Sequence, residues 1–264
     1  MPSRSLTKGW AARIRRLVSR GSGEAGEIPA QRLLEMILSD SYLSLHYRES
    51  YGKLLGLAGN GPGPMVEIGC GPGFVKRIDP TVITSDVEIG ASADLAADAA
   101  RLPFPDSSLR ALILKDALHH LPDVEAFLDE SSRVLRSGGV IAVLDPYWGP
   151  LAKAVYKWLH PEPFDPSART WQFESSSPHH SNQALLWILL RRDRDRFERR
   201  FPCFEILEHG PTIGPSFLLS GGLYGRTPLP SRLLEMMWKF EHNQGRWLDP
   251  LRFGYVVALR KKNS

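Results

Sequence analysis

The sequence has few cysteines and no long apolar run. Only Cys70 and Cys203 occur among its 264 residues, which excludes a disulfide framework and leads us to expect a reducing, cytoplasmic setting. No continuous apolar stretch follows the charged N-terminus, so we expect neither a signal peptide nor a membrane span. A hydrophobic content of 42% is ordinary for a folded domain, and the length allows one α/β domain with an additional cap.

The sequence is basic, with a net charge of +4 and a pI near 9.1. Part of this excess precedes the glycine-rich break at residues 21–23. It consists of Arg4, Lys8, Arg13, Arg15, Arg16 and Arg20. Because the excess positive charge is concentrated in this segment, it weakens the argument that the whole surface binds nucleic acid.

The same N-terminal segment is typical of a basic amphipathic helix. Trp10, Ile14, Leu17 and Val18 recur at helical spacing within residues 6–18, and the arginines occupy the other side. Two interpretations follow: a helix packed on the domain with a solvated cationic face, or peripheral contact with an anionic membrane surface or RNA.

A break at residues 59–64, with the sequence GNGPGP, divides the chain into an N-terminal helical part, 1–58, and a main domain, 59–264. Before the break, residues 29–57 predict two helices separated at residues 39–41. After it, short apolar runs alternate with helical segments, which is typical of parallel strands buried on both faces. The predicted strands cover residues 65–68, 82–84, 111–114 and 140–144, and the predicted helix before the last of them covers 124–135 and stops at Gly138 and Gly139.

Two insertions, at about 147–190 and 210–250, predict a cap on this domain. Insertions of this length in compact domains commonly carry function. Between and after them we expect a charged helix at 193–201, a strand at 204–208, a helix at 231–240 and a last strand at 253–259.

A glycine loop, residues 67–73 with the sequence EIGCGPG, follows the first predicted strand. Glycines at a strand-to-helix turn let backbone amides approach a ligand, but alone they indicate only a generic nucleotide site. Asp86 ends the next strand, where its carboxylate can accept hydrogen bonds from ribose hydroxyls. Asp98 and the Ala99 amide offer the acceptor and donor that match the edge of adenine.

This ordered series resembles the class I S-adenosylmethionine (SAM) dependent methyltransferases, of methyltransferase type 11, which include ubiquinone and menaquinone biosynthesis enzymes. The resemblance spans about residues 65–145. It is carried by the glycine loop, Asp86, the segment 98–104 (DAARLPF), the segment 117–121 (ALHHL) and the segment 133–139 (RVLRSGG).

The resemblance implies SAM as the cofactor and a role for each matching residue. Glu67, Gly69, Cys70, Gly71 and Gly73 would hold the methionine end, Asp86 with Val87 the ribose side, and Asp98 with Ala99 the adenine, while Lys115 would offer its backbone carbonyl to the methionine amine. The fold implied is a Rossmann-like α/β sheet, mostly parallel, with an antiparallel C-terminal strand. The short separation of Asp86 from Asp98 departs from the family pattern and predicts an abbreviated crossover.

His119 and His120 are the candidate catalytic residues, because they follow the predicted strand 111–114 near the expected methyl group. One of them could be a general base, or the pair could serve only to pack and orient the next helix. The predicted cap adds further candidates: Tyr147, Trp148, His160, Glu162, Trp171, His179 and His180. The aromatic side chains of Trp148, Trp158, Trp171 and Trp187 could form an apolar pocket over the methyl group or, equally, the core of the cap. We expect no metal site, because no cysteine or carboxylate spacing supports one.

Three functions fit these observations. The first is methyl transfer to a small-molecule acceptor, and the aromatic content of the cap favours an apolar or lipid-linked one. The second is RNA methylation, suggested by the basic N-terminal helix. The third is a SAM-binding sensor or scaffold. A dinucleotide dehydrogenase is disfavoured, because the spacing Gly-x-Gly-x-x-Gly is missing. The sequence does not indicate the acceptor, the atom methylated or the oligomeric state.

Overall fold

A seven-stranded sheet organises the computed structural model, which describes residues 28–90, 92–158, 160, 162–173, 181–222, 227 and 229–263. Its strand order is β3-β2-β1-β4-β5-β7-β6; β1 to β5 run parallel, and β7 is antiparallel to both β5 and β6. The strands are β1 Met65–Ile68, β2 Ile83–Asp86, β3 Leu95–Ala96, β4 Leu109–Lys115, β5 Leu135–Pro146, β6 Phe204–Thr212 and β7 Gly254–Lys261. This order confirms the predicted Rossmann-like sheet with its antiparallel C-terminal strand.

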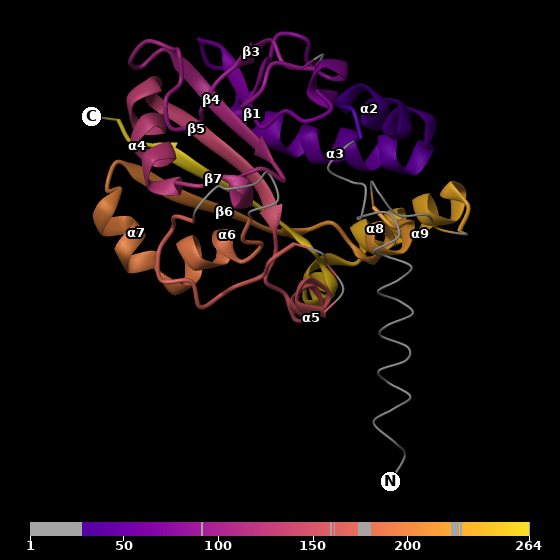
Figure 1. The fold of residues 1–264 in the computed structure, drawn as a ribbon. Helices are drawn as coiled ribbons and strands as arrows, with labels where there is room; N and C mark the ends of the chain where they lie inside the picture. Colours follow the sequence, from indigo (N-terminus) through magenta and orange to yellow (C-terminus); the bar gives the residue numbers. More distant parts are fainter. Residues whose placement is uncertain are drawn as a thin grey trace.

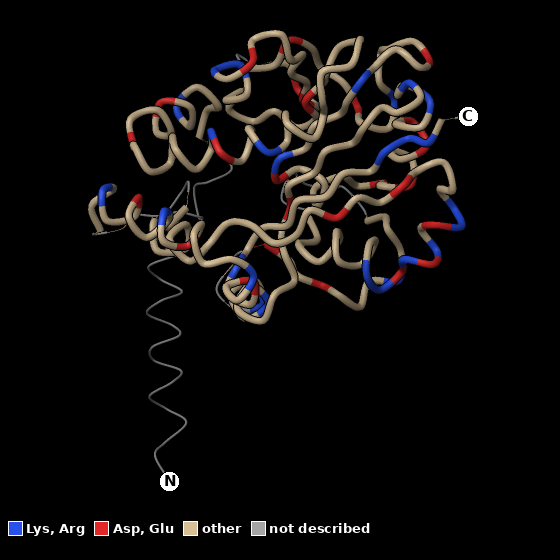
Figure 2. The backbone as a smooth tube through the Cα atoms, turned by 180° about the vertical axis from the view of Figure 1, so that it is seen from behind, with Lys and Arg blue, Asp and Glu red and all other residues tan. Residues whose placement is uncertain are grey.

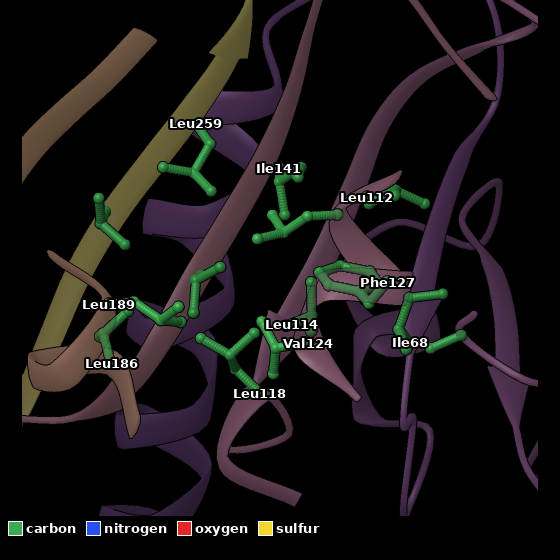
Figure 3. Close-up of a cluster of buried hydrophobic side chains, with 14 of the residues drawn as sticks. Ile68, Leu112, Leu114, Leu118, Val124, Phe127, Ile141, Leu186, Leu189 and Leu259 are labelled. Carbon is green, nitrogen blue, oxygen red and sulfur yellow. The ribbon is translucent and has the colours of Figure 1, made fainter. Parts of the chain in front are cut away.

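The central strands are buried on both faces, as their apolar runs predict. Leu112 and Leu114 of β4 point into one core and Ala111 and Ile113 into the other, because neighbouring residues of a strand face opposite sides. Figure 3 shows the first core, in which the ring of Phe127 lies near Ile68 and Leu112. The sheet is therefore the middle layer of three.

Helices cover both faces of the sheet (Figure 1). On one side lie α4 Val124–Val134, α6 Leu185–Trp187 and α7 Arg194–Arg200. On the other lie α2 Ala30–Ser39 and α3 Ser41–Ala58, which confirm the two helices expected before the glycine-rich break. Since α3 packs directly on β4 and β5, the N-terminal helices share the core of the sheet. The domain boundary near residue 59 stays a prediction.

Further helices lie within or at the end of the two insertions that are predicted to form a cap. They are α5 Pro150–Trp158, α8 Pro215–Ser220, α9 Ser231–Asn243 and a 3₁₀ helix at Gly245–Leu251. Sequence reasoning located α7 and α9 but missed α5, α6 and α8. These three are short, and their packing surfaces depend on contacts that local periodicity does not reveal.

Two local predictions were wrong in detail. The helix α4 does not stop at Gly138 and Gly139, because Leu135 already begins β5 and both glycines lie inside that strand. A Cβ at Gly139 would come within 2.8 Å of the Arg136 carbonyl, so this irregular part of the strand requires glycine. After the glycine loop the chain forms only a 3₁₀ helix, Phe74–Arg77.

The crossover from β2 to β3 is abbreviated, as predicted. Among its described residues, 87–90 and 92–94, no helix occurs. The predicted amphipathic helix at 6–18 lies outside the described residues. Within the described part of the chain, no helix is both long and apolar enough to cross a membrane. Cys70 and Cys203 are free, which confirms that they form no disulfide with each other.

Candidate active site

The strand order reverses beside β1, at the edge where the candidate residues gather. From β1 the chain moves outward to β2 and β3, then returns to the other side of β1 as β4. In open parallel sheets, ligands bind outside the carboxyl ends of the strands at such a reversal. The glycine loop follows β1 and the His119–His120 pair follows β4, so the fold brings these two predicted groups to one edge.

The glycine loop has a backbone that only glycine adopts without strain. Gly69, Gly71 and Gly73 have φ angles of +66°, +48° and +66°. A Cβ at Gly69 would lie 3.0 Å from the Cβ of Ala117, which couples the loop to the turn after β4. At Gly71 a Cβ would meet no atom within 4 Å, so this glycine faces open space.

Asp86 binds the loop directly. One of its carboxylate oxygens accepts a hydrogen bond from the Gly71 amide at 3.2 Å, and the other accepts from the amide of Val87 at 2.8 Å. The side chain of Val87 is 78% exposed beside it. Cys70 is buried, and burial is the largest cause that raises the pKa of its thiol to about 12, so the sulfur stays protonated and unreactive.

Glu67 is completely buried beneath the loop. The Tyr51 hydroxyl donates to its Oε1 at 2.5 Å, while its Oε2 has no hydrogen-bond partner. Burial raises the pKa of Glu67 to about 8, against the opposing effects of the Tyr51 bond and of nearby Lys115. An unpaired buried oxygen costs free energy, so this position favours an additional donor.

Lys115, Asp98 and Ala99 lie at the same edge of the sheet. The Lys115 ammonium donates to Asp116 Oδ2 at 2.5 Å and lies 4.3 Å from the centre of the Tyr47 ring. Asp98 is exposed and accepts from the Ala100 amide at 2.9 Å, and Ala99 is buried. Both follow β3, which pairs with the end of β2 at Asp86. Their roles toward SAM stay predictions.

A chain of charged groups extends from the end of β5 into the cap. Asp145 is fully buried, and its two oxygens accept from the backbone amide of His119 at 3.1 Å and contact its Nδ1 at 2.9 Å. The Nε2 of His119 lies 3.4 Å from Oε2 of Glu162, and the Nε2 of His120 lies 3.8 Å from the same oxygen. The structure therefore unites His119, His120 and Glu162, which the sequence offered separately.

The cap holds Glu162 in place. Ser181 Oγ donates to its Oε2 at 3.2 Å, and the Gln183 amide donates to the same oxygen. His160 accepts from the Glu162 backbone amide at 3.2 Å through Nδ1. Ser181 and Gln183 thus fix the carboxylate against the imidazoles, and His160 fixes the backbone of Glu162.

The two histidines differ in protonation state, since His119 is cationic and His120 is neutral. Burial lowers the pKa of His119, but Asp145 and Glu162 outweigh that effect and raise it well above 6.5, so His119 is cationic. Burial and the charge of His119 lower the pKa of His120 to about 4. At neutral pH the partly exposed imidazole of His120 is therefore unprotonated and able to accept a proton.

Only some of the predicted cap aromatics lie near this cluster. Trp148 stacks on Phe164 and Trp187, with ring centres 4.5 and 4.7 Å apart. Trp171, in contrast, is fully buried in the core against Phe197, and its indole nitrogen donates to Asp193. Trp171 is thus a core residue. His179 and His180 lie outside the described residues.

Five residues of the site were missed as functional groups. They are Tyr51, Asp116, Asp145, Ser181 and Gln183. Asp145 carried a signal, since it ends an apolar strand as Asp86 does. Asp116 has a φ of +53°, a conformation uncommon outside glycine that often marks functional sites. Tyr51 and Gln183 come from distant segments, so nothing in the local sequence links them to the site.

The comparisons with known proteins agree with this geometry. Residues 66–143 match the family model described as a methyltransferase domain. A relative, 27-O-demethylrifamycin SV methyltransferase from Amycolatopsis mediterranei (strain S699), is 43% identical over 71 residues, which are 27% of this chain and 26% of the relative. The chain therefore matches about a quarter of that relative's length.

Solved structures of similar fold are more distant. YcgJ from Bacillus subtilis has a TM-score of 0.46 at 17% identity, covering 83% of this chain and all of its own. Geranyl diphosphate C-methyltransferase from Streptomyces coelicolor A3(2) has a TM-score of 0.46 at 13% identity, covering 88% of this chain and 82% of its own. The match at residues 66–143, together with the strand order and the glycine loop, shows that the chain contains a methyltransferase domain of the class I fold.

Proposed function

We propose that this chain transfers a methyl group from SAM to a small-molecule acceptor bound between the cap and the carboxyl ends of β4 and β5. The observation that carries the proposal is the position of the unprotonated His120 imidazole. It lies beyond the glycine loop of the methyltransferase domain and beside Glu162, which belongs to the cap. A group able to accept a proton, close to the carboxyl end of β4, supports this proposal.

The residues present fit the cofactor. The orphaned Oε2 of Glu67 lacks a donor, and the ammonium of the methionine part would supply one. The open space at Gly71 admits a ligand against the backbone, and Asp86, at the end of β2 beside the loop, would bind the ribose. When bound, SAM supplies an electrophilic methyl group on a sulfonium, with a neutral thioether as leaving group.

The chain's own residues orient the acceptor and remove its proton. Asp145 holds His119 through its backbone amide and through its ring Nδ1, and burial together with the charge of His119 keeps His120 neutral. His120 accepts the proton of the acceptor's nucleophile, while the ordered cap limits the entry of water. Positioning of this kind accounts for a large share of the rate in transfers with a good leaving group.

The acceptor is inferred to be a small molecule with an apolar body. The rings of Trp148, Phe164 and Trp187 stack on one another, and Phe164 lies two residues after Glu162 in the sequence. The name of the A. mediterranei relative gives a rifamycin as the molecule that enzyme methylates, which supports a small acceptor and oxygen as the atom methylated.

Calorimetric titration with SAM tests the cofactor site. We expect saturable binding, and Asp86→Ala should weaken it by about 10- to 150-fold, since a charge-assisted hydrogen bond is worth roughly 1.5–3 kcal/mol. Asp195→Ala, which removes an exposed acid from α7, is the matched control. Absence of SAM binding by the unmodified chain would refute the proposal.

Transfer itself is tested with SAM carrying a tritiated methyl group. The label should enter an organic-extractable small-molecule fraction of a cell extract, and His120→Gln should reduce its rate about 10²- to 10⁴-fold, the usual contribution of a general base. Label recovered only in RNA would instead support the RNA methyltransferase alternative. Tight binding of SAM without any transfer would support a sensor.

A further inference from the structure

The outer face of α9 carries a row of exposed apolar side chains. Met236 and Phe240 are 66% and 58% exposed, and Leu233 precedes them at helical spacing. Trp247, in the 3₁₀ helix that follows, is 63% exposed. Large apolar side chains that remain exposed together on one element mark a contact surface more often than a solvated one.

Basic side chains border this row. Arg232 and Lys239 of α9 are exposed and form no ion pair within the part of the chain that the structure describes. Arg246 is 98% exposed and reaches Asp249 only at 3.9 Å. The outer face of α9, together with the turn that follows it, therefore presents both apolar side chains and cations.

The acidic side chains of the same segment bind other groups of the protein. Glu241 is buried and accepts from the amide and hydroxyl of Ser216, both at 2.7 Å. Glu235 accepts a hydrogen bond from Ser41 of α3. Asp249 is paired with Arg252 at 3.3 Å. The acids of the segment are thus bound to protein groups, whereas Arg232 and Lys239 have no ion-pair partner among the described residues.

We propose that this face, Leu233, Met236, Phe240 and Trp247 with Arg232, Lys239 and Arg246, binds the surface of an anionic lipid bilayer. Apolar side chains bordered by cations are the combination that lies in a bilayer interface, where the rings enter the acyl boundary and the cations contact lipid phosphates. The charge favours this partner over a second copy of the chain, whose same face would bring like charges together.

The position of the face agrees with this proposal. In Figure 1, α8 and α9 lie at the periphery, beside α2 and α3 and far from α4 and α7. The inner side of α9 contributes Leu234 to a small core with Tyr42 and Leu43, so the helix is anchored while its outer side stays free. Neither the glycine loop nor His120 belongs to the face, so the proposal is independent of catalysis.

Sedimentation with lipid vesicles tests the proposal on the full chain. We expect binding to vesicles of equal parts phosphatidylcholine and phosphatidylglycerol, weak binding to phosphatidylcholine alone, and a loss of binding as salt rises. Reversing two cations with Arg232→Glu and Lys239→Glu should weaken binding by at least about tenfold, since each cation near an anionic surface contributes roughly fivefold.

The apolar row is tested separately with Phe240→Ser and Trp247→Ser, which should also lose binding by at least about tenfold. The controls are Leu38→Ser on α2 and Arg199→Glu on α7, which change exposed residues of the same kinds elsewhere. SAM binding of every variant is measured to verify its fold.

Variants that sediment as the unmodified chain does would locate the contact elsewhere, residues 1–27 included, and overturn the proposal. A chain that does not sediment, or that dimerises through this face, would overturn it equally.

Discussion

The charge of His119 lowers the pKa of the neighbouring His120 imidazole. The rings of His119 and His120 are 4.2 Å apart, and His119 is held cationic between Asp145 and Glu162. A cation so close disfavours protonation of His120, in addition to the larger effect of burial. His119 is therefore a positioning residue in this proposal, and its effect should be visible in a pH profile.

That profile gives the first prediction. Since the pKa of His120 is lowered to about 4, kcat/KM should stay constant as pH falls through 6.5 and decline only near pH 4, where His120 gains its proton. His119→Gln removes the neighbouring charge and should move the acid limb upward by on the order of one pH unit. An acid limb that stays in place in this variant would show that His119 does not act through His120.

Metal removal gives the second prediction. His119, His120 and Glu162 offer nitrogen and oxygen atoms within 4.8 Å of one another, a spacing that also suits a cation. In the assignment above, His119 instead carries a proton between two carboxylates. Dialysis against a chelator should therefore leave the rate of methyl transfer unchanged, and a loss that zinc restores would contradict this assignment.

At the scale of elements, Asp40 connects the N-terminal helices to the cap. Its Oδ1 caps α3 by accepting from the Leu43 amide at 2.9 Å, and its Oδ2 accepts from Ser231, at the start of α9, at 3.0 Å. Asp40→Ala should lower the free energy of unfolding by roughly 1–2 kcal/mol. Urea unfolding should show a lower midpoint with an unchanged slope, whereas the neighbouring exposed Ser39→Ala should shift it little.

The elements also show what the sequence could predict. Long periodic segments such as α3 and the four-strand core were found, because burial on one face or both leaves a repeating pattern. The site was found where residues follow strands, as Asp86 and His119 do. The link from Asp145 through His119 to Glu162 and Gln183 joins four separate segments, and only tertiary packing brings them together.

At the scale of the whole molecule, the cofactor should stabilise the fold. The glycine loop contacts the turn after β4 and the end of β2, so SAM would contact several strands of one sheet. SAM at a hundred times its Kd should add about 2.7 kcal/mol to the free energy of unfolding, which a thermal shift measures. Gly71→Val, which fills the open space of the loop, should abolish the shift.

The charge of the molecule is distributed in keeping with a small-molecule enzyme. In the view of Figure 2, Lys and Arg positions alternate with Asp and Glu positions along the described backbone. Many of these cations are paired, such as Arg133 with Glu130 and Asp106. Arg232 and Lys239 of α9, in contrast, form no ion pair with any described residue.

The short crossover between β2 and β3 affects which analogues of the cofactor the protein can bind. Where a helix would cover the adenine edge, the described residues offer only a loop in which Val87 and Ile89 are 78% and 72% exposed. An adenine bound there would be open at its outer edge. We therefore expect the chain to accept SAM analogues carrying bulky groups on the adenine amine, and to be retained by a resin that displays the cofactor through that atom.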